Sequence, residues 1–257
     1  MSVVEPDAAV TGLDGKVALV TGGGGDGGSG LGAAIAEALV AAGASVVVTD
    51  VRTSAAEGVA ARIRAAGGDA LALALDVTDD AAWSAAVAAS VSARGALDVL
   101  VSSAGVAAFD VGPFDLDAWD HVVTTNMRGA FLGMRHAIPV MVEGGGGAVV
   151  NITSSAGSVG VRGMHMAYGA SKAAIRQMTR SAAAEFGHAG VRVNALAPGM
   201  LRGRHRDRGR AAPPAGIPLG RLGHPAEIAR AAVFLLSDAT YVTGAELVAD
   251  GGYLVQR

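Results

Sequence analysis

The chain has 257 residues, of which 51% are hydrophobic and 17% are charged, and no segment rich in proline or serine divides it, so we expect one domain with a large core. The formal net charge of −3 gives no general reason to expect nucleic acid or an acidic membrane as a partner, and no apolar run reaches the roughly 18 residues that a membrane-spanning helix needs. The absence of cysteine excludes disulfides and thiolate metal sites, and we expect no metal. These features predict a soluble protein of the cytoplasm.

The first segment, Met1 to Gly15, carries acidic side chains but neither a basic cluster nor an apolar stretch. It therefore does not resemble a signal or transit peptide. We expect a flexible arm over residues 1–15 and a single folded domain over residues 16–257.

Short apolar runs alternate with amphipathic stretches of helix length along the rest of the chain. The predicted strands cover residues 16–21, 45–50, 70–75, 97–102, 148–153, 191–196 and 246–249. The predicted helices cover residues 30–42, 54–66, 79–94, 116–142, 166–188 and 225–236. The strands are rich in Val, Leu and Ile, which is typical of parallel strands covered on both faces. The alternation predicts an α/β fold with one doubly wound parallel sheet of about seven strands and helices on both faces.

A glycine-rich loop separates the first predicted strand from the first predicted helix. It runs from Thr21 through Gly22 to Ser29, Gly30, Leu31 and Gly32. Glycines let the backbone turn tightly and approach a pyrophosphate, and the amides at a helix N-terminus favour the negative charge. A glycine run can also be a flexible loop, but its place between strand and helix favours a dinucleotide site.

Asp50 ends the second predicted strand. A carboxylate there can accept hydrogen bonds from the ribose hydroxyls of NAD and repel the 2′-phosphate of NADP. The glycine loop contains no lysine or arginine, and Asp26 adds a negative charge to it. We therefore expect NAD, while Arg52 leaves NADP open as a less favoured alternative. The alternative without a function is that Asp50 is an ordinary aspartate in a turn.

Tyr168 and Lys172 are four residues apart near the start of a predicted helix. This spacing places both side chains on one helix face, about one turn apart. An ammonium group near a phenol favours the phenolate and lowers a phenol pKa that is about 10 in isolation. The pair predicts a general acid/base. A chance pairing is improbable because the chain has only three tyrosines.

Further motifs accompany this pair. Ser155 ends the stretch Asn151-Ile-Thr-Ser-Ser and stands 13 residues before Tyr168. Asn126 begins Asn-Met-Arg-Gly, and Pro198-Gly199 follows the sixth predicted strand. The C-terminal part contains Pro218-Leu-Gly-Arg-Leu-Gly-His-Pro-Ala-Glu-Ile and, later, Asp250-Gly-Gly. With these motifs the chain resembles the short-chain dehydrogenase/reductase family over nearly its whole length.

The resemblance implies a Rossmann-like fold and an oxidoreductase that interconverts a secondary alcohol and a ketone. It implies that Tyr168 exchanges a proton with the substrate oxygen, that Ser155 hydrogen-bonds this oxygen, that Lys172 holds the nicotinamide ribose, and that Asn126 holds a water between Lys172 and solvent. Isolated Asn and Ser residues are more often satisfied locally. The expected cofactor contacts are Gly22, Ser29, Gly30, Leu31, Asp50, Asp76, Val77, Ser103, Ala104, Gly105, Tyr168, Lys172, Pro198 and Gly199.

The resemblance also implies a homotetramer, with the helices at 116–142 and 166–188 between subunits. The partner is then a small alcohol or ketone. Neither nucleic acid nor a membrane is expected as a partner.

The chain departs from the family in its glycine loop and after the fourth strand. Seven residues, not the usual three, separate Gly22 from Gly30, and Gly25-x-Gly27-x-x-Gly30 offers a second register. Ser102 and Ser103 stand where the family usually has two asparagines, so we expect weaker bonding between strands at the cofactor edge.

A third departure lies in the predicted substrate lid, at about residues 200–217. Gly203 takes the place of a threonine that usually contacts the carboxamide, and residues 202–210 hold five arginines against one aspartate. Such a segment is most simply a solvated loop, but it can also pair with an anionic substrate. The departures keep open a second hypothesis, a binding protein that retains the fold without efficient cofactor use.

Overall fold

The computed structural model describes residues 12–25, 30–109, 111–203 and 216–256. Within them, seven parallel strands form one sheet in the order β3-β2-β1-β4-β5-β6-β7. The strands are β1 (Val17–Thr21), β2 (Ser45–Asp50), β3 (Ala70–Ala74), β4 (Val99–Ser102), β5 (Gly147–Ile152), β6 (Val191–Pro198) and β7 (Glu246–Ala249). The order reverses between β1 and β4, as it does in doubly wound folds. The predicted fold class is confirmed.

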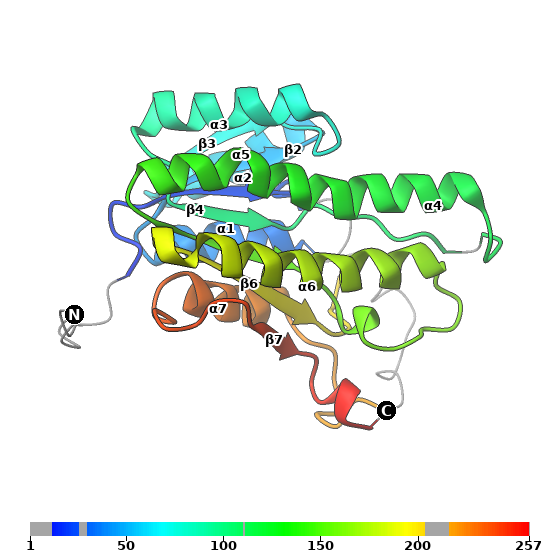
Figure 1. Ribbon diagram of the computed structural model, residues 1–257. Helices are drawn as coiled ribbons and strands as arrows, with labels where there is room; N and C mark the ends of the chain where they lie inside the picture. Colours follow the sequence, from blue (N-terminus) through cyan, green and yellow to red (C-terminus); the bar gives the residue numbers. More distant parts are fainter. Residues whose placement is uncertain (1–11, 26–29, 110, 204–215, 257) are drawn as a thin grey trace.

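Helices cover both faces of this sheet (Figure 1). They are α1 (Leu31–Ala41), α2 (Thr53–Ala65), α3 (Asp80–Arg94), α4 (Leu116–Val122), α5 (Gly129–Glu143), α6 (Met166–Phe186) and α7 (Pro225–Leu236). A π-helical turn, Val123–Arg128, joins α4 to α5, and short 3₁₀ turns cover Ser155–Gly157, Gly187–Ala189 and Tyr253–Gln256. The helices α1, α2 and α7 pack in one core, and α3, α5 and α6 pack in the other.

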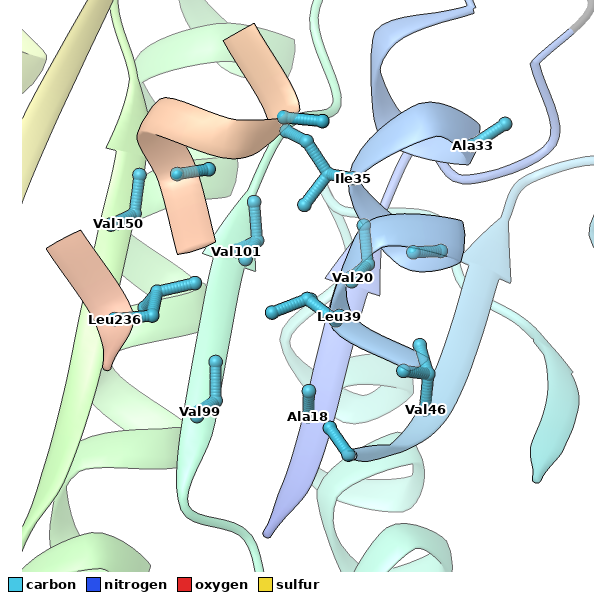
Figure 2. Packing of buried hydrophobic residues seen from close by; sticks show 14 of the residues in the cluster. Ala18, Val20, Ala33, Ile35, Leu39, Val46, Val99, Val101, Val150 and Leu236 are labelled. Atoms are coloured by element: carbon cyan, nitrogen blue, oxygen red, sulfur yellow. The ribbon is translucent and has the colours of Figure 1, made fainter. Parts of the chain in front are cut away.

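The two cores explain why the strands are continuously apolar. Ala18 and Val20 of β1 lie in the core under α1 and α7, and Leu19 between them lies in the opposite core. Successive strand side chains point to opposite faces, so both sets must be hydrophobic when both faces are covered. Figure 2 shows the first core, where Ile35 and Leu39 of α1 approach the strand side chains.

The stretch predicted as helical at 116–142 is helical throughout, but a π turn at Val123–Arg128 divides it into α4 and α5. The predicted arm at 1–15 ends too late: Leu13 is only 4% exposed in the first core, and its amide donates a 2.6 Å hydrogen bond to Ala42 O. An apolar side chain that fills the core there anchors residues 12–15 to the domain. Residues 1–11 lie outside the described part of the chain.

Among the helices that the structure describes, none is both long enough and apolar enough to cross a bilayer.

Candidate active site

The residues expected to bind a cofactor or substrate gather along one edge of the sheet, at the carboxyl ends of the strands. Gly22 follows β1, Asp50 ends β2, Ser103 follows β4, Ser155 follows β5, and Pro198 ends β6. Parallel strands bring these ends together, and doubly wound sheets bind ligands at this edge, where the strand order reverses. Ser29, one of the expected contacts, lies outside the described residues.

The glycines after β1 allow two backbone segments to approach closely. Gly22 has a φ of 64°, and a Cβ there would lie 2.8 Å from Cα of Ala104, in the loop after β4. A Cβ on Gly32 would collide with the carbonyl oxygen of Gly22. Gly30 caps α1 in the left-handed region, at a φ of 72°. The contact between Gly22 and Gly32 favours the register with the longer loop. Gly27 of the alternative register is not among the described residues.

Thr21 organises this edge, and sequence reasoning assigned it no role. Its Oγ1 accepts hydrogen bonds from the amides of Ser103 and Ala104, both at 3.0 Å. These bonds hold the loop after β4 against the end of β1, where Gly105 lies next to Asn126 and Lys172. The available signal was its place directly before the first glycine of the loop.

Asp50 is held rigidly at the end of β2. Its Oδ2 accepts a 3.1 Å hydrogen bond from the amide of Gly24, and its Oδ1 accepts a 3.0 Å hydrogen bond from the amide of Arg52. The Arg52 Nε lies 3.6 Å from Oδ1, and its side chain is half exposed. The carboxylate thus ties the glycine loop to β2 while it remains at the edge where a ribose would lie.

Tyr168 and Lys172 lie on one face of α6, as predicted. The Nζ of Lys172 is 5.7 Å from the centre of the Tyr168 ring and donates a 2.8 Å hydrogen bond to Ile152 O at the end of β5. Lys172 is 4% exposed, and burial lowers its pKa to about 8 because the charged form loses hydration. A buried ammonium group beside a phenol is suited to stabilise a phenolate.

Ser155 is buried in the 3₁₀ turn after β5, and two glycines seat this turn directly on α6. A Cβ on Gly157 would lie 3.0 Å from the amide nitrogen of Ala173, and a Cβ on Gly169 would lie 2.8 Å from Ala156 O. Sequence reasoning missed both glycines. The close contact sets how far the Ser155 turn stands from the face of α6 that carries Tyr168.

Asn126 is buried in the π-helical turn, a local irregularity that is frequent at functional sites. Its Nδ2 donates to Val106 O at 2.9 Å and to Ser171 Oγ at 3.1 Å, and its Oδ1 accepts from the amide of Val106 at 2.8 Å. A Cβ on Gly105 would lie 3.2 Å from this Oδ1 and 3.4 Å from the Lys172 Nζ. Asn126 and Lys172 therefore meet at Gly105.

The remaining expected contacts lie at the rim of this edge. Asp76 Oδ1 accepts hydrogen bonds from the amide and hydroxyl of Thr78, and Val77 is buried beside them. Gly199 follows β6, and a Cβ there would lie 2.6 Å from Cα of Asp250, so the chain can carry no side chain at this point.

The predicted lid begins next to this rim. Arg202 donates its amide to Gly223 O at 2.8 Å and is exposed. Gly203 is the last described residue before residue 216, and residues 204–210 of the arginine-rich segment lie outside the described ranges.

The serine at position 102 leaves a gap in the hydrogen bonding of the sheet edge. Ser102 Oγ is buried without a partner, and so is Oδ1 of Asn151, the residue that pairs with Ser102 between β4 and β5. The expected weakness between these strands therefore has a structural counterpart at this pair. Within the described residues, no three His, Asp or Glu side chains are grouped as metal ligands are.

Comparisons with known proteins agree with this architecture. Residues 26–254 match a family model described as enoyl-(acyl carrier protein) reductase. The chain is 44% identical over 254 residues to 2,5-dichloro-2,5-cyclohexadiene-1,4-diol dehydrogenase LinX of Sphingobium indicum, covering 95% of this chain and 98% of the relative. It is 41% identical over 252 residues to D-threitol dehydrogenase of Mycolicibacterium smegmatis, covering 95% of each.

A solved structure from Burkholderia xenovorans, described as a short-chain dehydrogenase/reductase, superposes with a TM-score of 0.88 at 38% identity and covers 95% of this chain and 98% of its own. The similarity extends over nearly the full length of these proteins. The chain therefore belongs to the short-chain dehydrogenase/reductase family and is an oxidoreductase that acts on CH–OH groups.

Proposed function

We propose that this protein is an NAD-dependent dehydrogenase that interconverts a secondary alcohol and a ketone, with Tyr168 as the general acid/base. The observation that carries the proposal is the buried ammonium group of Lys172 beside the Tyr168 ring, on the face of α6 next to the Ser155 turn. Such a cation favours the phenolate that a base for an alcohol proton requires.

Three side chains carry the proposed reaction. Tyr168 Oη takes the hydroxyl proton of an alcohol, or returns a proton to a ketone oxygen. Ser155 Oγ donates a hydrogen bond to the same oxygen and orients it. Lys172 stabilises the phenolate and holds the nicotinamide ribose. When bound, the nicotinamide ring supplies the hydride acceptor for oxidation and the hydride donor for reduction.

In the proposed mechanism Asn126 stabilises the local structure and also helps to hold a water molecule. Both N–H groups of its amide are used by Val106 and Ser171, so it holds the π turn in place. A water between Asn126 and Lys172 would accept from the Nζ and donate to an Asn126 oxygen. This arrangement would connect the buried amine to solvent.

The expected dinucleotide fits the edge of the sheet. Gly22 and Gly32 let the loop after β1 pack directly against the start of α1, and Gly30 caps that helix in the left-handed region. The first amides of α1, together with Ser29 and Leu31, would bind a pyrophosphate. Asp76 and Val77 would bracket the adenine, and the loops at 103–105 and 198–199 would flank the riboses and the nicotinamide.

Asp50 is the reason to propose NAD. Its carboxylate is oriented by two backbone amides and would accept hydrogen bonds from the adenosine ribose hydroxyls. A 2′-phosphate would add a like charge beside it. Arg52 keeps NADP as the alternative, although its guanidinium already faces Asp50.

The relatives suggest the class of substrate. One is named for a cyclic diol and the other for a four-carbon polyol, and both are dehydrogenases. We propose a small polyol or cyclic alcohol as the substrate here. We also propose a homotetramer in the cytoplasm, with α4, α5 and α6 between subunits. The hypothesis of a non-catalytic binding protein loses support because the relatives are enzymes.

The test is hydride transfer by the purified protein. NAD and NADP are each offered with cyclic diols, open-chain polyols and simple secondary alcohols, and the absorbance of the reduced nicotinamide is followed. We expect reduction of NAD with at least one cyclic or polyol substrate. Activity with NADP alone would refute the cofactor assignment, and calorimetry that detects neither nucleotide would refute the proposed function.

A further inference from the structure

A chain of four side chains lies behind the Ser155 turn, apart from the reacting groups. Thr153 Oγ1 donates a 2.9 Å hydrogen bond to Oε1 of Glu246, at the start of β7. The other carboxylate oxygen of Glu246 lies 3.3 Å from Nη1 of Arg176, and the same Nη1 donates a 2.8 Å hydrogen bond to Ser158 Oγ. The ion pair is partly buried, with 12% of the Glu246 side chain and 28% of the Arg176 side chain exposed.

These four side chains, together with the backbone from 153 to 158, form a closed ring that contains Ser155. Thr153 and Ser158 are its two ends on the backbone, and Ser155 lies between them in sequence. The segment from 153 to 158 leaves the sheet at Ile152 and turns through the 3₁₀ helix. Its first residue, Thr153, is also hydrogen-bonded to Leu196 O of β6, and Gly157 packs on α6, so the ring adds side-chain bonds to a turn that already has backbone contacts. The ion pair of Arg176 and Glu246 ties both of its ends to α6 and β7.

The same helix carries the proton-transfer residues. Arg176 is four residues after Lys172, so both side chains project from one face of α6. Lys172 holds Ile152 O, directly before the segment, and Arg176 holds Ser158, at its end. Helix α6 therefore carries Tyr168 and also binds both ends of the segment that contains Ser155, through Lys172 at Ile152 and through Arg176 at Ser158.

We propose that Arg176 and Glu246 are positioning residues that set Ser155 relative to Tyr168. This inference rests on the proposed dehydrogenase function, because it assumes that Ser155 and Tyr168 must contact one substrate oxygen. A hydrogen bond to that oxygen depends steeply on distance and angle, so a small displacement of the turn lowers turnover without changing the distant cofactor contacts.

The experiment compares Arg176→Met, Glu246→Gln, Glu246→Leu and Ser158→Ala with a matched control, Arg180→Met. Arg180 is exposed one turn further along α6. For Arg176→Met and Glu246→Leu we expect kcat to fall on the order of 10- to 100-fold, with the dissociation constant of NAD changed less than about twofold. Glu246→Gln retains an acceptor for Thr153 and should keep more activity than Glu246→Leu. The control should match the parent protein.

A double variant separates a shared network from two local effects. If Arg176 and Glu246 act through one ring, Arg176→Met combined with Glu246→Leu should lower kcat little more than either change alone. Additive losses would contradict the proposal. So would an unchanged kcat in Arg176→Met and Glu246→Leu. If the double variant does not fold, Ser158→Ala removes a single hydrogen bond and must still lower kcat measurably.

Hydrogen exchange of the amides in residues 153–158 supplies a readout besides activity. We expect faster exchange there in Arg176→Met and Ser158→Ala, with α7 unchanged. Faster exchange combined with normal turnover would show a purely structural role and overturn the inference. If the parent protein oxidises no alcohol, the proposed function is refuted. If hydrogen exchange at 153–158 is the same in the variants as in the parent protein, only the positioning role of Arg176 and Glu246 is refuted.

Discussion

The Nζ of Lys172 lies 5.7 Å from the centre of the Tyr168 ring and is bonded to Ile152 O at the end of β5. A cation at this distance interacts favourably with the electrons of an aromatic ring. Because the two residues are one helical turn apart, their relation is set mainly by α6 itself. The bond to Ile152 then places this face of the helix over the carboxyl end of the sheet.

The first prediction concerns Tyr168→Phe. The change removes the transferable proton but keeps the ring, so kcat should fall by about 10²- to 10⁴-fold with little change in the dissociation constant of NAD. Steady-state kinetics and calorimetry measure the two quantities. Near-normal turnover would show that another group moves the proton.

The second prediction is that Lys172→Met stabilises the cofactor-free protein while it abolishes most activity and weakens NAD binding. At pH 7 the native protein holds a charged amine in its interior, and methionine fills a similar volume without this cost. The loss of the bond to Ile152 O offsets part of the gain. We expect an increase in the free energy of unfolding of about 1–3 kcal/mol at pH 7.

This gain should depend on pH. The pKa of Lys172 is about 8 in the folded protein and 10.5 as a model value, so between these values the unfolded chain binds a proton that the folded chain does not. Stability of the parent protein therefore rises with pH in this window relative to the variant. Urea unfolding at pH 7 and pH 10 should show the difference between the two proteins shrinking. A constant difference would contradict the assigned cause.

Much of the fold follows from the sequence pattern because local rules set it. Alternating apolar runs predicted all seven strands, and the sheet order is that of a doubly wound fold. The π turn around Asn126 was not predicted, because a continuous helical pattern carries no sign of one inserted backbone residue. The burial of Leu13 was missed as well, since a single apolar residue among polar ones has no periodicity.

The site divides in the same way. Tyr168, Lys172 and Ser155 were identified from spacing and resemblance, and the structure brings their elements together, while their roles stay predictions. The ring through Arg176 and Glu246 joins residues 70 positions apart in sequence. Only the tertiary fold makes these two residues neighbours, so no local pattern could reveal them.

The third prediction concerns the choice of cofactor. NAD should bind about 10- to 100-fold more tightly than NADP because of the Asp50 charge. Asp50→Asn removes this charge and keeps an oxygen that can accept from the amide of Gly24, so the preference should narrow with the loop still held. Asp50→Ser should also narrow the preference for NAD. Because the serine side chain is shorter, it should hold the glycine loop less well. Arg52→Ala should leave NAD binding nearly unchanged. Tighter NADP binding by the parent protein would contradict the role of Asp50.

The fourth prediction concerns Arg192 on β6, which caps the end of α7. Its guanidinium donates hydrogen bonds to the carbonyl oxygens of Leu235, Leu236 and Ala239, and burial lowers its pKa. Arg192→Met would leave these carbonyls without their donor, and we expect a loss of about 2–4 kcal/mol in the free energy of unfolding. Arg230→Met on the exposed side of α7 is the control. Equal unfolding midpoints for the two variants would refute the capping role.

The last prediction compares two buried hydroxyl groups at the cofactor edge. Thr21 Oγ1 accepts from the amides of Ser103 and Ala104, whereas Ser102 Oγ has no partner. Thr21→Val would leave two amides unbonded, so the free energy of unfolding should fall by about 1–3 kcal/mol, with weaker NAD binding. Ser102→Ala removes a hydroxyl that gains nothing from burial, so stability should stay equal or rise by up to about 1 kcal/mol. Denaturant unfolding of both variants tests this prediction, because only Thr21→Val is expected to lower the free energy of unfolding. A loss of stability in Ser102→Ala as large as that in Thr21→Val would show that the serine has a partner, such as a water shared with Asn151 Oδ1, and would overturn this account of the β4–β5 edge.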